Sequence, residues 1–135
     1  MRTTFDTDTI LFSLLRNAPG LKSAISGDIY IGERPDNSEK EDITINTIDM
    51  TQEHLPQIGV SNVNIHCPDK LIRIAQVSQK KADRERLKAI TALVLPALRS
   101  ANIKGLSLVV ANQTTIQEPA MSQHYVNIRI NWVIH

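Results

Sequence analysis

The strongest constraint on the fold is a segment near the end of the chain, residues 126–134, where every second side chain is apolar and polar side chains alternate with them as far as Trp132. The apolar side chains share one parity and are Val126, Ile128, Ile130, Trp132 and Ile134. The polar side chains between them include Asn127, Arg129 and Asn131. Because successive side chains of a strand point to opposite faces of a sheet, this pattern predicts a long strand with one buried face. Trp132 is therefore expected in the core, beneath a second layer of structure.

Four shorter segments carry the same kind of strand signal. They cover residues 28–32, 43–47, 63–67 and 106–110. Ile48 changes parity after the second of these segments, so that strand is expected to end or to bulge there. Val60 changes parity before the third, which predicts another irregularity near Ser61. Pro68 is expected to end the third strand, because proline cannot donate to a sheet ladder.

The first helix signal covers residues 10–18, where apolar side chains recur at helical spacing. Asp6 or Thr7 is expected to cap its N-terminus, since both side chains can accept a hydrogen bond from the first turn. Pro19 and Gly20 are expected to stop it. A further short turn of helix is predicted between residues 21 and 25.

A second and longer helix is predicted after Asp83, the expected N-cap. One apolar stripe runs along it, made of Leu87, Ile90, Val94, Ala97, Leu98 and Ala101. Pro96 lies inside this helix and removes one backbone hydrogen bond. We expect either a kink near Ala92 or an early end to the helix.

These elements predict an α+β fold with two helices packed on one face of a mainly antiparallel sheet of about four to five strands. The length of 135 residues fits a single domain, residues 1–135. Two segments carry no regular period: a polar loop at residues 33–42 and an irregular loop at residues 68–82. No apolar run is long enough to span a bilayer, and no export signal precedes the first helix, so a cytoplasmic protein is expected.

Motifs for phosphate cradles, nucleophile elbows and zinc proteases are missing from the sequence. The neighbours His66 and Cys67 could form a base and a nucleophile, but adjacent strand residues face opposite ways, so Cys67 is expected to be a buried structural residue. The residues that could bind zinc are far apart: His54, His66, Cys67, His124 and His135. No catalytic residue, cofactor or metal is predicted.

Charge is distributed unevenly along the chain. Residues 1–69 carry five basic and eleven acidic side chains, whereas residues 70–135 carry ten basic and three acidic ones. Three interpretations remain open: the two halves cancel each other within the fold, the protein associates with itself, or the basic half binds a phosphate-bearing partner. Opposed patches on one molecule suit a head-to-tail contact, which can close into a ring.

The order of parts resembles that of the small tail-completion and tail-terminator proteins of long-tailed bacteriophages and prophages. The resemblance covers roughly residues 9–135 and lies in the segments ILFSLLRNA, GDIYIGERP, VNIHCPDK, RERLKAITALVLPALRSA and YVNIRINWVIH. It implies a non-enzymatic virion component that forms a ring, often hexameric, at the end of the tail. Implied partners are tail-tube and head-completion proteins. The implied location is the host cytoplasm during assembly and then the virion tail.

We therefore expect binding alone, between copies of the chain or with DNA in the ring lumen. The expected basic contact residues are Lys70, Arg73, Lys80, Lys81, Arg84 and Arg86. The expected acidic contact residues are Glu33, Asp36, Glu39, Glu41 and Asp42, in a loop where carboxylates should be hydrated. The alternatives are a small nucleic-acid-processing enzyme and a regulatory domain that binds a ligand between the helices and the sheet.

Overall fold

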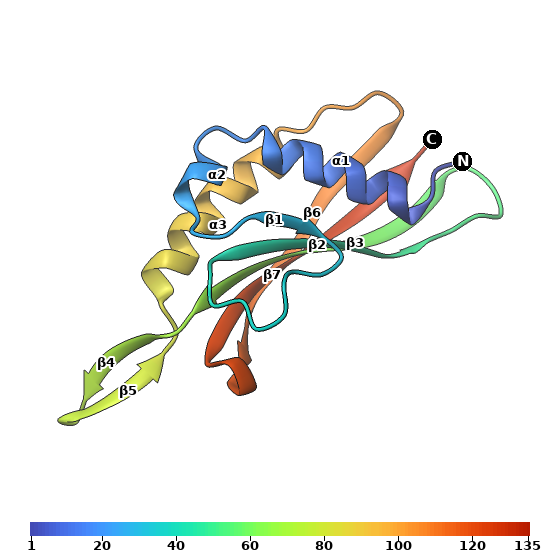
Figure 1. The fold of residues 1–135 in the computed structure, drawn as a ribbon. Coiled ribbons are helices and arrows are strands. Elements are labelled where there is room, and N and C mark those ends of the chain that lie inside the picture. The colour runs from blue at the N-terminus through green and yellow to red at the C-terminus, as the bar shows by residue number, and fades with distance from the viewer.

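The computed structural model describes residues 1–135 and confirms the α+β class. A five-stranded sheet has the order β1-β2-β3-β7-β6, and Figure 1 shows helices α1 and α3 together on one side of it. The strands of this sheet are β1 (Ile29–Ile31), β2 (Asp42–Met50), β3 (Gln57–Pro68), β7 (Gln123–Ile134) and β6 (Leu106–Glu118). Only the short β1–β2 pair is parallel, and the other pairs are antiparallel. The prediction of a mainly antiparallel sheet is therefore confirmed.

Apolar side chains from both layers form one core. The five apolar residues predicted to face inward from β7 are between 0% and 4% exposed, so the predicted inward face of this strand is confirmed. Helix α1 (Thr4–Arg16) adds Leu11 and Leu15, while α3 (Arg84–Arg99) adds a stripe that contains Leu87 and Val94. Burying each such side chain contributes about 1.5–3 kcal/mol, so this contact between the layers is the main source of stability.

A chain of hydrogen bonds crosses the core beside Trp132. The indole Nε1 donates to Ser61 Oγ at 2.7 Å, and the Ser61 hydroxyl lies 2.7 Å from Thr47 Oγ1. Thr47 Oγ1 in turn lies 2.8 Å from Thr7 Oγ1 of α1. These bonds satisfy polar groups that would otherwise be costly to bury, and they connect α1 to three strands.

The irregularity predicted near Ser61 is not in β3, although the register shift of neighbouring β2 lies opposite Ser61 and Val60. Strand β3 pairs with β7 in continuous register from Gln57 to Pro68. The polar residues Gln57 and Ser61 point inward because each has hydrogen-bond partners there. Val60 has the opposite parity and faces outward, so regular alternation is kept along β3. The bulge lies instead on β2, between Thr47 and Asp49, where the parity change at Ile48 predicted it.

The N-cap predicted for α1 was also wrong. The helix begins one turn earlier, capped by Thr3, whose backbone N–H donates to Asp6 Oδ2 at 2.6 Å. Asp6 is thus the third residue of a capping box rather than the cap. Asp8 turns inward and accepts the Thr47 N–H at 2.7 Å. A short helix α2 (Leu21–Ala24) follows, as predicted.

Helix α3 begins as predicted, after Asp83, and does not end early at Pro96. Asp83 caps it by accepting the Arg86 N–H. The helix continues through Pro96 to Arg99, so an early end is excluded. Pro96 and Ala92 are both exposed, which places the missing hydrogen bond on the solvent side of the helix. None of the helices is long and apolar enough to cross a membrane.

Strand β6 is longer than predicted, because its inward-facing residues change from apolar to polar partway along the strand. Leu106, Leu108 and Val110 point toward the helices, and a register shift follows between Val110 and Asn112. Beyond this bulge the exposed residues Gln113 and Thr115 take the same face. Alternation of apolar residues ends at the bulge, so the sequence signal stops there although the ladder continues to Glu118.

Candidate interaction surfaces

The irregular loop predicted at residues 68–82 is a β-hairpin, so that prediction was wrong. Strands β4 (Lys70–Ile74) and β5 (Val77–Lys81) pair with each other in a separate two-stranded sheet. The turn residues Ala75 and Gln76 have φ angles of 49° and 65°. Two-residue turns of this hand usually use Asn or Gly, and neither is present here, so no turn signal marked the hairpin.

This hairpin projects away from the body of the molecule, as Figure 1 shows. Its apolar side chains are unusually open: Leu71 is 67% exposed and Val77 is 58% exposed. Its basic residues Arg73, Lys80 and Lys81 are also exposed. The hairpin therefore combines positive charge with apolar side chains and leaves both available to another molecule.

The loop between β1 and β2 carries the acidic residues that were expected to be hydrated. Glu33, Asp36 and Glu39 are exposed, as expected. Asp42 is not in the loop but begins β2, where it is 1% exposed. Arg34 Nη1 donates to Asp42 Oδ2 at 3.4 Å, so this carboxylate stabilises the chain's own fold. The expectation of a hydrated Asp42 was wrong.

Glu41 and Arg86 join the acidic half of the sequence to the basic half within one molecule. Arg86 Nε donates to Glu41 Oε2 at 2.7 Å, and Nη2 donates to Oε1 at 2.9 Å. The hydrogen bonds from Arg86 hold the pKa of Glu41 below its usual value. A second basic residue of the predicted contact set, Lys70, lies 3.8 Å from Asp83. Ion pairs within the molecule thus account for part of the charge asymmetry. The exposed residues of the projecting hairpin and of the β1–β2 loop form no such pair.

An acidic pocket of about 510 Å³ opens between this loop and the end of β6. Glu33, Asp36 and Glu118 line it together with Arg34, and His66 is also among its lining residues. The His66 side chain is 8% exposed, and its Nε2 lies 3.1 Å from Thr44 Oγ1 while its Nδ1 has no partner. Burial, assisted by the positive charge of Arg34, lowers the pKa of His66 to about 4.

Cys67 faces away from this pocket, which confirms the opposite orientation predicted for the two neighbours. Its side chain belongs to the core and is 2% exposed. Burial raises the pKa of the Cys67 thiol to about 12, so the thiolate is strongly disfavoured. No three residues among the histidines, cysteine and acids are grouped so as to hold a metal ion.

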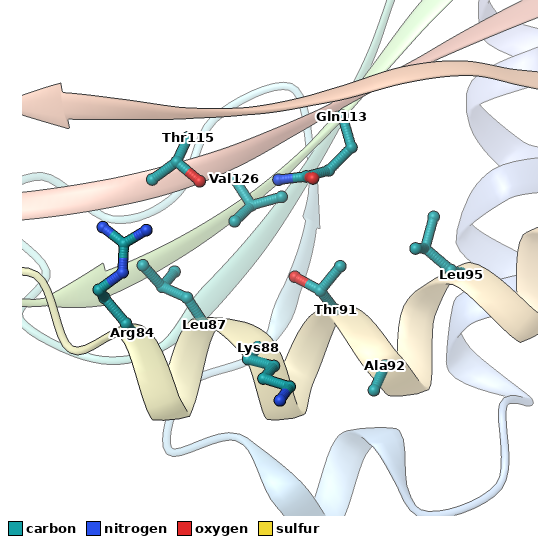
Figure 2. A pocket seen from close by; sticks show the side chains of 9 residues that line it. All are labelled: Arg84, Leu87, Lys88, Thr91, Ala92, Leu95, Gln113, Thr115 and Val126. Carbon is teal, nitrogen blue, oxygen red and sulfur yellow. The ribbon is translucent and has the colours of Figure 1, made fainter.

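A groove of about 440 Å³ separates the first half of α3 from β6 (Figure 2). Leu87, Thr91 and Leu95 line it from the helix, and Gln113 and Thr115 line it from β6. Figure 2 shows the guanidinium of Arg84 pointing from the start of α3 toward the strands. Arg84, expected among the basic contact residues, is the first residue of α3 and lies beside this groove rather than on the projecting hairpin.

Comparison with known proteins identifies the fold. Neither a scan of protein-family models nor a search of curated proteins finds a match. Among solved structures, the chain is similar to a chain of the "Virion of native gene transfer agent (GTA) particle", with a TM-score of 0.71 and 12% sequence identity. The alignment covers 99% of this chain and 98% of that chain. The two proteins therefore share one fold over their full lengths.

Proposed function

We propose that this protein is a structural component of a phage-like virion that forms a ring at the end of the tail. Its role would be tail termination, tail completion or head–tail joining. The observation that carries the proposal is the full-length likeness to a virion chain, at a TM-score of 0.71. The order of sequence segments supports it independently, since that order resembles the tail-completion and tail-terminator proteins. The protein acts by binding and needs no catalytic group.

The contact between copies joins the projecting hairpin of one molecule to the acidic pocket of the next. Arg73, Lys80 and Lys81 supply positive charge, and Glu33 and Asp36 supply negative charge. Exposed ion pairs contribute only about 0–1 kcal/mol each, so they orient the partners more than they hold them. Burial of Leu71 and Val77 against the neighbour supplies the larger share of the affinity.

This contact uses different surfaces on the two partners. Such a head-to-tail contact forms a closed ring when its rotation closes, and a hexamer is one such ring. The tail-tube and head-completion proteins would contact the two faces of the ring. DNA passing through the lumen is a second candidate partner for the basic residues.

The location in the particle can be tested directly. Deleting the gene in a cell that releases particles should leave heads and tails unjoined or tails of uncontrolled length, as seen by electron microscopy. A plasmid copy of the gene should restore complete particles, and antibody labelling should mark one end of the tail. Normal particles from the deletion strain, or absence of the protein from purified particles, would overturn the proposal.

The contact between copies has its own test in solution. Light scattering across ionic strength should detect association that weakens with salt, because the Debye length falls from about 10 Å at 0.1 M to about 3 Å at 1 M. Lys80→Glu with Lys81→Glu should weaken association, and adding Glu33→Lys with Asp36→Lys should partly restore it. If the basic reversal leaves association unchanged but abolishes DNA binding, the basic residues serve the nucleic acid instead.

A further inference from the structure

Strand β6 leaves one edge of the sheet unpaired. It is the last strand in the order β1-β2-β3-β7-β6, and its only ladder is the one with β7. Residues 112–117 are all exposed and include no charged residue and no proline. Charged residues and prolines normally protect an edge strand from pairing with another chain. The unprotected edge at residues 112–117 can therefore accept a further strand.

The groove beside this edge leaves room for the side chains of an added strand. Gln113 and Thr115 occupy the helix-facing row of β6, yet both remain exposed because α3 does not cover them. Leu87 and Val126 are buried within the groove, and Thr91 Oγ1 is buried without a hydrogen-bond partner. Figure 2 shows these side chains facing one another across the opening. The groove thus offers an apolar floor to an incoming side chain.

The charge of the groove indicates which segment fits. Arg84 and Lys88 line it, are exposed, and form no ion pair within the chain. The hairpin of a second copy is itself basic and would be repelled. The acidic loop of a second copy is anchored at its end, where Glu41 accepts from Arg86 and Ser26 of its own molecule. The charge complementarity of Arg84 and Lys88 therefore favours an acidic segment of another protein.

We infer that the groove between α3 and β6 binds an extended acidic segment of a different protein, which adds a strand to the edge of β6. Backbone hydrogen bonds to residues 112–117 would supply part of the affinity. Alternate side chains of the segment would enter the groove, and its carboxylates would meet Arg84 and Lys88. This surface is separate from the hairpin and the acidic pocket, so the inference does not rest on the proposed function.

A displayed library of random ten-residue peptides provides the probe. Selection against the full chain should enrich peptides that carry two or more carboxylates, interspersed with valine, isoleucine or threonine. The best synthetic peptide should bind at least tenfold more weakly to Arg84→Glu with Lys88→Glu, measured by fluorescence polarisation. The matched control, Lys40→Glu with Lys104→Glu, reverses two exposed charges elsewhere and should bind like the wild type. Urea unfolding of each variant checks that it is folded.

A second measurement tests the strand addition itself. Hydrogen exchange should show slower exchange at residues 112–117 when the peptide is bound, and N-methylation of alternate peptide bonds should abolish binding. Failure to enrich acidic peptides, unchanged binding by the reversed variant, or tight binding of the N-methylated peptide would each overturn the inference. If Arg84→Glu with Lys88→Glu instead changes the association state of the chain alone, the groove is an interface between copies and the inference fails.

Discussion

Two hairpins of this protein, β6–β7 and the projecting β4–β5, use apolar residues in opposite ways. In β6–β7, helices cover the inward face of β7, and Val126, Ile130 and Trp132 are at most 3% exposed. In β4–β5, no second layer covers either face, and Leu71 and Val77 are more than half exposed. The first hairpin stabilises the fold. The second places comparable side chains where only another molecule can bury them.

This difference also separates the energetic roles of the two regions. A two-stranded hairpin without a packed face is marginally stable in water, so β4–β5 depends on its short connections to β3 and α3. The core hairpin shares its side chains with two helices and forms part of the cooperative unit. Substitutions in the first region should therefore change stability, and substitutions in the second should change association.

The largest expected effect comes from truncating the centre of the core hairpin. Trp132→Ala should lower the free energy of unfolding by about 3–5 kcal/mol, because it leaves a cavity and removes the hydrogen bond to Ser61. Urea denaturation followed by circular dichroism measures this loss. Trp132→Phe is the matched control and should cost less, since it preserves most of the volume. A loss below 1 kcal/mol in Trp132→Ala would show that β7 is not the centre of the core.

Acid should destabilise the five-stranded sheet through His66 of β3. The projecting hairpin β4–β5 contains no histidine and should not respond in this way. The folded-state pKa of His66, about 4, lies below the usual 6.5, so protonation favours unfolding. The stability is fully present above pH 6.5 and is lost as the pH falls toward 4, by about 3 kcal/mol in total. His66→Gln should remove this pH dependence. Equal slopes for wild type and variant in urea titrations from pH 7 to 4 would contradict the assignment.

A smaller effect is expected at the ion pair that joins the two halves of the sequence. Glu41→Gln should lower the free energy of unfolding by about 1 kcal/mol, because Arg86 is 40% exposed and solvent screens the pair. The folded-state pKa of Glu41 lies below its usual 4.5, so this stability is present above pH 4.5. It is lost as the pH falls through the lowered value. Urea denaturation should show a difference in unfolding free energy between wild type and variant at pH 7, and this difference should disappear at pH 3.

The smallest change in stability is expected in the projecting hairpin. Leu71→Ser with Val77→Ser should alter the free energy of unfolding by less than about 0.5 kcal/mol, since both side chains are already exposed. The same variant should lose self-association in light scattering. A large loss of stability would show that the hairpin packs onto its own molecule, and unchanged association would remove it from the contact between copies.

Local sequence patterns predicted the structure correctly where they agreed with the packing around them. The alternation through Trp132, the helical stripe containing Leu87 and the cap at Asp83 were all found in their predicted places. Local patterns failed where polar residues are buried with partners or where apolar residues are left open. The parity of Val60 predicts an irregularity at Ser61 that β3 does not contain, because the inward Ser61 bonds to Thr47 and Trp132, which are far away in the sequence.

The candidate contact residues divide in the same way. The charge count identified an acidic and a basic half, but it could not tell which charges meet within the molecule. The structure pairs Glu41 with Arg86 and buries Asp42 beside Arg34, which leaves Lys80 and Glu33 among the charges open to partners. The groove beside β6 had no sequence signal at all, because it forms between α3 and a strand edge whose residues lack an apolar period.

The sequence by itself determined where the main helices and strands of the core lie and the apolar face that β7 and α3 bury, since periods of two and 3.6 residues follow from backbone geometry. Tertiary structure alone decided that residues 70–81 form a hairpin, because the turn at Ala75 and Gln76 lacks the usual residues and the strands lack a buried face. It also decided which charges and which strand edge remain free. Those outcomes depend on contacts between residues far apart in the chain, which no local pattern encodes.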